Sequence, residues 1–147
     1  MWSALFFTAN GIALAGWVLL TAFPRKPLTH SAILYLGVAL LCLIYTVCFA
    51  LVVGGGWGGG LSPEASGFSL AGVRAFFATD AGAFIGWTHY LAFDLFTGLW
   101  IARDADSKQV SRLVQLPFLI LTYLLGPIGL LGWLVFRESK ARAAGRG

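Results

Sequence analysis

Charged residues are scarce in this sequence of 147 residues. Only 11% of the side chains are Asp, Glu, Lys or Arg, whereas 59% are hydrophobic, and the mean hydropathy is +0.83. In soluble domains roughly a quarter of the residues are charged. An ordinary soluble fold is therefore excluded, and the composition predicts an integral membrane protein.

Cysteine and histidine are also rare, with two residues of each. Cys42 and Cys48 are six residues apart in one apolar stretch, so they point about 240° apart on a helix and cannot face one another. His89 is the only histidine inside an apolar stretch, since His30 lies at the end of one. We therefore expect no disulfide framework, no metal or haem site and no other cofactor.

Long hydrophobic stretches, in contrast, occupy most of the sequence. Four of them are about 20 residues long, which is the length that spans a hydrocarbon core of roughly 30 Å. They predict one all-α domain over residues 1–147, an integral membrane four-helix bundle. The predicted spans cover residues 3–23, 31–53, 81–101 and 114–136.

The start of the sequence has neither a basic leader nor a small-x-small cleavage site after the first stretch. Because a secretory signal has both, we expect the first stretch to be retained as a helix. A Ser/Arg-rich transit peptide is also absent. These features predict a location in a bacterial inner membrane.

The connections between the stretches differ in length. Residues 24–30 form a short link with two prolines, so the first two spans are expected to be antiparallel neighbours. In the second connection, apolar residues at helical spacing predict a short interfacial helix over residues 70–78, and Thr79 is expected to cap the third span. In the last stretch, Gly126 and Pro127 fall at mid-membrane and predict a bent helix.

The net charge of +4 comes from basic residues near the ends of the spans. With four spans, five lie on each face, so the positive-inside rule leaves the orientation open. The uncharged start of the first stretch, followed by Arg25 and Lys26, favours an outside N-terminus. Nucleic-acid binding is not expected, and anionic lipid headgroups are the expected partners of Arg137, Lys140 and Arg142. One face carries Arg25, Lys26, Arg103, Lys108 and Arg112, and the other carries Arg74, Arg137, Lys140, Arg142 and Arg146.

The third stretch carries two ionisable residues, His89 and Asp94, at mid-span. An ionisable side chain there costs about 2.5–3.5 kcal/mol, so a compensating role is expected. On a helical wheel they share one half with Trp87, Tyr90 and Thr97, and this half is expected to face the bundle. Two interpretations stay equally open: an acid-base site, or polar contacts between helices with Asn10 as an available partner. The other half, expected to face lipid, holds Phe84, Ile85, Thr88, Leu91, Ala92, Leu95, Phe96 and Leu99.

Three motifs resemble the abscisic-acid-deficient-like family. They are Trp87-x-His89-x4-Asp94-Leu95-Phe96, Arg103-Asp104 and Gly126-Pro127-x-Gly129-Leu130-Leu131. The plant member of this family is required for making neoxanthin from violaxanthin. The resemblance implies an isomerase-type reaction that opens a carotenoid epoxide without a redox cofactor.

This resemblance implies a site in the third span. Asp94 would protonate the epoxide oxygen and His89 would accept the proton lost from carbon, while Tyr90 would orient Asp94 by a hydrogen bond. The ligand would be a carotenoid or another isoprenoid lipid. The alternative is a non-catalytic protein that binds a lipid or stabilises a complex with a second copy or a membrane enzyme. The expected substrate-binding residues are Asn10, Trp87, Tyr90, Phe93, Thr97, Trp100, Tyr123 and Pro127.

Overall fold

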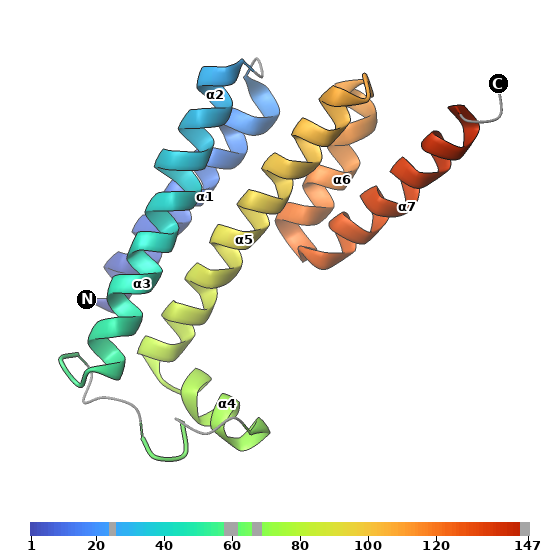
Figure 1. Ribbon diagram of the computed structural model, residues 1–147. Helices are drawn as coiled ribbons and strands as arrows, with labels where there is room; N and C mark the ends of the chain where they lie inside the picture. Colours follow the sequence, from blue (N-terminus) through green and yellow to red (C-terminus); the bar gives the residue numbers. More distant parts are fainter. Residues whose placement is uncertain (24–25, 58–61, 66–68, 145–147) are drawn as a thin grey trace.

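A computed structural model describes residues 1–23, 26–57, 62–65 and 69–144, with side chains described as far as residue 138 (Figure 1). The regular structure of these residues is entirely helical, in agreement with the predicted all-α class. In chain order, the elements are α1 (Trp2–Ala22), α2 (Pro27–Ala32), the π-helix η1 (Ile33–Ala39), α3 (Leu40–Val53), α4 (Leu70–Phe77), α5 (Asp80–Ser107), α6 (Arg112–Leu125) and α7 (Pro127–Ala144).

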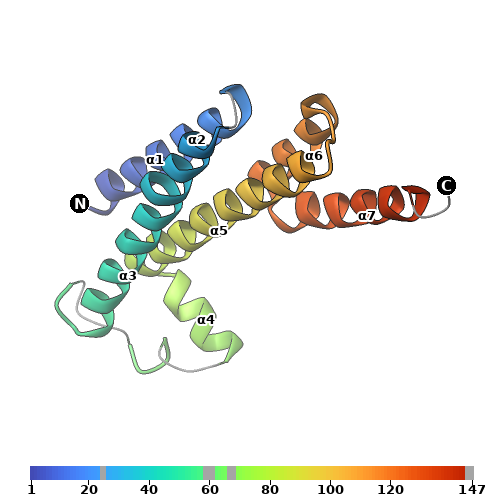
Figure 2. The same ribbon diagram turned by 45° about the horizontal axis from the view of Figure 1, so that its top comes forward.

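The first two predicted spans are confirmed as long helices. α2, η1 and α3 follow one another without a break, so the second helix runs from Pro27 to Val53 and starts four residues earlier than predicted. A proline is tolerated at the first position of a helix, where no N–H donor is needed. Figures 1 and 2 both show α1 and this second helix side by side and antiparallel. Of the described helices, these two are long and apolar enough to cross a membrane.

α5 is the central helix and packs against α1, the second helix, α4 and α6. Its fully buried Leu95 lies against two glycines, Gly16 of α1 and Gly37 of η1. A β-carbon on either glycine would come within 2.6 Å or 2.9 Å, respectively, of a Leu95 methyl carbon. The small residues therefore let the three helices approach closely, as is typical of helix packing without a strong hydrophobic driving force.

The predicted orientation of α5 is wrong. Most of the half that was expected to face lipid is buried, with Thr88, Leu95 and Leu99 each at most 2% exposed, although Phe96 of that half is exposed. Trp87 and Tyr90 of the other half are 45% and 57% exposed. The prediction assumed that polar side chains turn inward. Instead, Leu95 of α5 packs against Gly16 and Gly37 of the neighbouring helices, so the polar side chains are not needed to fill the interior.

The last predicted span, over residues 114–136, is also corrected. It consists of two helices, α6 and α7, which meet at Gly126 and form a V beside the C-terminal half of α5 (Figures 1 and 2). Arg112, at the start of α6, donates to the carbonyl of Phe23 at 2.6 Å, and Arg137 of α7 pairs with Asp104 of α5 at 2.9 Å. Both ends of the stretch thus lie at the same end of the molecule, so a four-helix bundle is not formed.

The Gly126-Pro127-x-Gly129 motif explains this α6–α7 hairpin. Gly126 has φ 46° and ψ −94°, a left-handed conformation that favours glycine, and Pro127 occupies the first position of α7. A β-carbon on Gly129 would overlap the backbone nitrogen and the hydroxyl of Thr122. Glycine at this position is therefore what lets α7 fold back directly onto α6.

The predicted interfacial helix is present as α4, which ends one residue earlier than expected. The hydroxyl of Ser69 accepts from the N–H of Gly72 at 3.0 Å and caps it. The expected cap of α5 is confirmed as well, because the Thr79 hydroxyl accepts from the N–H of Gly82 at 2.9 Å.

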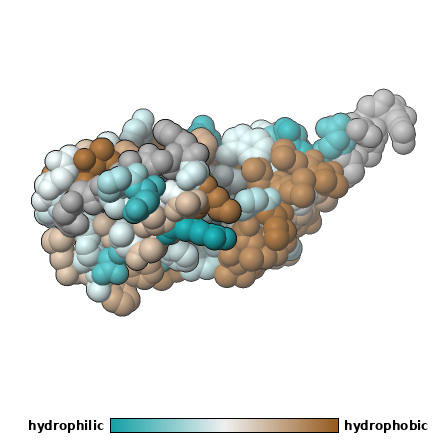
Figure 3. Space-filling view, turned by 90° about the horizontal axis from the view of Figure 1, so that it is seen from below, coloured by the Kyte–Doolittle hydropathy of each residue, from teal (hydrophilic) through white to brown (hydrophobic). Residues whose placement is uncertain are grey.

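Apolar side chains are also exposed on the hairpin. Figure 3 shows them as the brown lobe on the right of the molecule. Such a surface is unfavourable in water but matches the acyl chains of a bilayer. Its exposed residues include Leu124, Leu125, Ile128, Leu131 and Val135.

Candidate functional site

An uncovered stretch of α5 contains both ionisable residues of the predicted site. On the N-terminal side of this stretch, α4 covers the helix by placing Phe77 against Gly86, and on the C-terminal side the hairpin covers it by placing Gly126 against Asp94. Phe93, between these two contacts, is 56% exposed. We call this stretch the α5 shelf, and it consists of Trp87, His89, Tyr90, Phe93 and Asp94.

Asp94 lies halfway along the 28 residues of α5, at the tip of the hairpin. A β-carbon on Gly126 would lie only 2.6 Å from Oδ1 of Asp94, so the carboxyl group packs against the turn between α6 and α7. The expected hydrogen bond from Tyr90 to Asp94 is not formed. The ring of Tyr90 instead packs edge-on against the ring of His89, with the centroids 6.1 Å apart. Within the described part of the chain, the half-exposed Asp94 side chain makes no hydrogen bond or ion pair.

His89 lies on the opposite edge of the shelf, towards α3. Its ring stacks on Phe93 with the centroids 4.6 Å apart and lies 5.7 Å from the ring of Tyr45. His89 and Asp94 are about 140° apart around the helix. The two residues therefore flank an exposed aromatic surface and do not face the helix bundle as predicted.

Asn10 is paired with Trp87. The indole N–H of Trp87 donates to Oδ1 of Asn10 at 3.2 Å, while Nδ2 of Asn10 donates to the carbonyl of Phe6 at 2.7 Å. This bond places Trp87 at the edge of the shelf next to α1. Asn10 is thus a contact between α1 and α5, although with Trp87 and not with His89 or Asp94.

A groove of about 400 Å³ lies beside Trp87, between the N-terminal parts of α1 and α5. Most of its wall is aromatic, and it is continuous with the shelf through Trp87. The groove residues of α1 were not predicted from the sequence, although Trp2, Phe6 and Phe7 are spaced as on one side of a helix. The groove is lined by Trp2, Ser3, Phe6, Phe7, Asp80, Ala83, Phe84 and Trp87.

The remaining predicted residues lie near the hairpin. Tyr123 packs edge-on against Trp17 at 5.5 Å, and Pro127 follows the turn that contacts Asp94. Thr97 and Trp100 are in a separate cleft of about 370 Å³ between α5 and α7. Of the predicted site, the structure therefore places Pro127 next to the turn that contacts Asp94, Tyr123 against Trp17, and Thr97 and Trp100 in another cleft.

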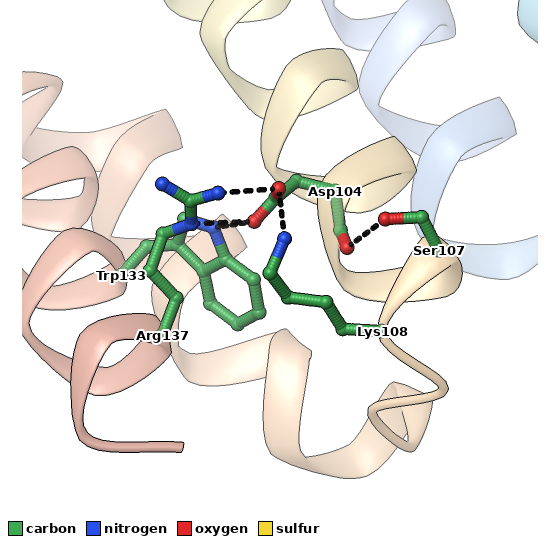
Figure 4. Close-up of polar contacts among 5 residues, drawn as sticks. All are labelled: Asp104, Ser107, Lys108, Trp133 and Arg137. Atoms are coloured by element: carbon green, nitrogen blue, oxygen red, sulfur yellow. Dashed lines mark hydrogen bonds and ion pairs between the residues drawn. The ribbon is translucent and has the colours of Figure 1, made fainter. Parts of the chain in front are cut away.

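Asp104 ties α7 to the C-terminal end of α5 (Figure 4). Its carboxylate accepts two hydrogen bonds from Arg137, both 2.9 Å, one from Lys108 at 2.6 Å and one from the buried indole of Trp133 at 3.0 Å. Arg137 was expected to face lipid headgroups, but here it is held in this ion pair. The side chains of Lys140 and Arg142 lie outside the described residues.

The pKa of the Asp104 carboxyl group is lowered. Burial alone raises this pKa, but the hydrogen bonds from Lys108, Arg137 and Trp133 and the charge of Arg137 together outweigh burial. The carboxylate is therefore held in its charged form, which keeps the α5–α7 contact intact.

We expect the stability of the hairpin to fall in acid. An unfolded aspartate has a pKa of about 3.9. Because the folded pKa is lower, Asp104 stabilises the fold fully above that pH and loses this effect as the pH falls through the folded pKa. Thermal unfolding in detergent, followed from pH 6 downwards, would test this against Asp104→Asn. The variant should be less stable at pH 6 and depend less on pH, and parallel curves would contradict the assignment.

The described residues contain no group of three or more His, Cys, Asp or Glu side chains that could hold a metal ion. The absence of a metal and of other cofactors stays a prediction. The shelf carries three groups with acid-base chemistry, which are the imidazole of His89, the phenol of Tyr90 and the carboxyl group of Asp94.

Two helices that are long and apolar enough to cross a membrane, beside a hairpin with exposed apolar side chains, suggest a small helical protein of the membrane-associated class. A family model described as ABA DEFICIENT 4-like matches residues 4–133, and the chain belongs to this family, as its motifs predicted. At family level it is therefore related to neoxanthin-synthase-type proteins. Comparisons with curated proteins and with solved structures gave no match.

Proposed function

We propose that this protein spans a membrane and acts on a carotenoid or another isoprenoid lipid that lies along the α5 shelf, with Asp94 as the proton donor. The groove next to Trp87 receives one end of the apolar ligand. Asn10, Phe93 and Tyr123 flank its path.

The exposure of the shelf is the observation that carries this proposal. In a bilayer, ionisable side chains almost always face the protein interior or pair with each other. Here His89 is exposed and Asp94 is half-exposed, and neither side chain is turned into the interior, where residues such as Leu95, Gly16 and Gly37 pack together. A ligand that covers both groups removes the cost of leaving them against acyl chains, and exposed rings such as Tyr90 and Phe93 offer it a flat apolar surface.

The chemistry proposed for the site is the opening of an epoxide. Asp94 donates a proton to the epoxide oxygen as the C–O bond breaks, and a neighbouring carbon loses a proton as the new double bond forms. The product has the same atoms as the substrate, with a hydroxyl group in place of the epoxide. His89 accepts the proton only if the ligand lies across Phe93, and the Asp94 carboxylate is the alternative acceptor.

Chromatography of pigments and lipids tests this function. A strain that lacks the gene should accumulate one isoprenoid compound and lose another of equal mass, because an isomerisation leaves the mass unchanged. A plasmid copy of the gene should restore the original profile. Identical profiles in the wild-type, deletion and complemented strains would overturn the proposal.

A second candidate function is non-catalytic, and the same exposed shelf favours it if a second protein covers the shelf. For His89 and Asp94, a role in polar contacts between helices of a single chain receives no support, because neither residue makes a hydrogen bond within the described residues. This function predicts that His89→Gln and Asp94→Asn lower the yield of a membrane complex without changing any metabolite.

A further inference from the structure

The α6–α7 hairpin changes the number of times that the chain crosses the membrane. A single span over residues 114–136 would place Arg112 and Arg137 at opposite faces. Instead, Arg112 bonds the carbonyl of Phe23 and Arg137 bonds Asp104, and both partners lie where α1 and α5 end. The hairpin therefore enters and leaves at one face.

The depth of the hairpin agrees with a re-entrant segment. Its tip at Gly126 contacts Asp94 in the middle of α5, and Arg137 contacts Asp104. From Gly126 to Arg137 α7 rises about 16 Å, which matches the rise of about 15 Å from Asp94 to Asp104 on α5. α7 thus returns from mid-depth to the face where α6 began, and its charged residues start at that level.

Non-helical backbone at this depth requires that its polar groups are satisfied. The N–H of Gly126 donates to the carbonyl of Thr122 at 2.9 Å, and the N–H groups of Gly129 and Leu130 both donate to the carbonyl of Gly126, at 3.1 Å and 3.3 Å. Pro127 has no N–H group. The turn can therefore lie in the hydrocarbon region with few unpaired groups.

The hairpin also changes the count of basic residues on the two faces, which was equal for four spans. Among the residues whose side chains the structure describes, the end of the molecule where α5 ends carries five basic residues, and we call it the basic end. The opposite end carries Arg74 of α4. The basic end consists of Lys26, Arg103, Lys108, Arg112 and Arg137. In the sequence, Arg25 is next to Lys26, and the last turns of α7 contain Lys140 and Arg142.

We infer that the chain crosses the membrane three times, through α1, the second helix and α5, with the basic end and the C-terminus at the anionic cytoplasmic face and with the N-terminus and α4 at the other face. α5 is less apolar than the first two spans, but it is 28 residues long and packs against both of them. Lys and Arg close to the ends of spans are retained on the cytoplasmic side, where anionic headgroups attract them. The position of Arg103 agrees with a face that has anionic headgroups. Arg103 lines a small cavity with His30 and Ser31 at this end, and the neighbouring carboxylate of Asp104 is paired with Arg137 instead. The inference rests on the membrane location in the proposed function.

Labelling from each side of the membrane tests the inference. The full chain, with Cys42 and Cys48 changed to alanine, is produced in the inner membrane of a Gram-negative bacterium with a different epitope tag at each end. Single cysteines replace Ser62, in the second connection, or Ser107, at the end of α5. Spheroplasts and inside-out vesicles are then treated with a protease and with a maleimide that does not cross membranes.

We expect the N-terminal tag and Ser62→Cys to react in spheroplasts, and the C-terminal tag and Ser107→Cys to react only in inside-out vesicles. Two termini on the same side would overturn the hairpin while leaving the proposed function intact. Termini on opposite sides with the C-terminus outside would overturn the assignment from charge. Release of the protein by alkaline carbonate would overturn both the inference and the membrane location that the proposed function needs.

Discussion

Asp94→Asn is expected to lower the turnover of the isoprenoid substrate by about 100-fold or more, because asparagine cannot donate a proton and general acid catalysis typically contributes about 10²–10⁴-fold. The fold should persist, since Asp94 makes no hydrogen bond or ion pair in the described structure that asparagine would break. Chromatography of the complemented deletion strain measures the conversion. The melting temperature of the purified variant reports on the fold, and we expect it to change by less than about 4 °C.

His89→Gln is the matched variant for this experiment. It removes the imidazole of the shelf but leaves the carboxyl group in place against Gly126. If His89 is the proton acceptor, this variant loses conversion as well. If it keeps most of the conversion, the Asp94 carboxylate takes the proton itself. Full conversion by Asp94→Asn would remove the catalytic proposal, whereas a large loss of stability without a change in metabolites would favour the non-catalytic one.

Gly129→Ala is expected to destabilise the protein by about 3 kcal/mol, because the added methyl group overlaps backbone atoms of Thr122 that cannot rotate away. The melting temperature should fall by about 6–12 °C in a chain of this size. Scanning fluorimetry in detergent measures the change, since the buried Trp133 of α7 reports on the hairpin.

Gly11→Ala is the control for the change of glycine to alanine in a helix. Gly11 lies in α1, and a β-carbon there would have nothing within 4 Å. Alanine has the higher helix propensity, so this variant should be as stable as the wild type or up to about 1 kcal/mol more stable. Equal melting temperatures for Gly129→Ala and Gly11→Ala would show that α7 does not fold back onto α6 in this way.

The positions of the helices could be predicted from the sequence because each depends on local signals. Apolar runs placed α1, α3 and α5, and hydroxyl caps at Ser69 and Thr79 mark the starts of α4 and α5. The hairpin depends instead on a contact between helices. A Gly-Pro pair predicts a bend, but only the fit of Gly129 against Thr122 and the ion pair of Arg137 with Asp104 determine that the bend is a reversal.

The role of the predicted site residues stays a prediction, whereas their surroundings differ from those expected. His89 and Asp94 were singled out by the cost of burying an ionisable group, and the structure does place them at mid-helix on the shelf. Their direction was predicted wrongly, because a helical wheel records which residues share a face but not which face has neighbours. That depends on Gly16 and Gly37, which are distant in sequence and receive Leu95 of α5.

The depth at which the hairpin turns also determines from which monolayer of the membrane a substrate reaches the shelf. The shelf occupies the half of α5 between Asp80 and the hairpin tip, and the basic end lies beyond the other half. With the basic end at the cytoplasm, Tyr90 and Phe93 touch only the outer monolayer. An isoprenoid compound made at the cytoplasmic surface would have to flip across before this protein could bind it.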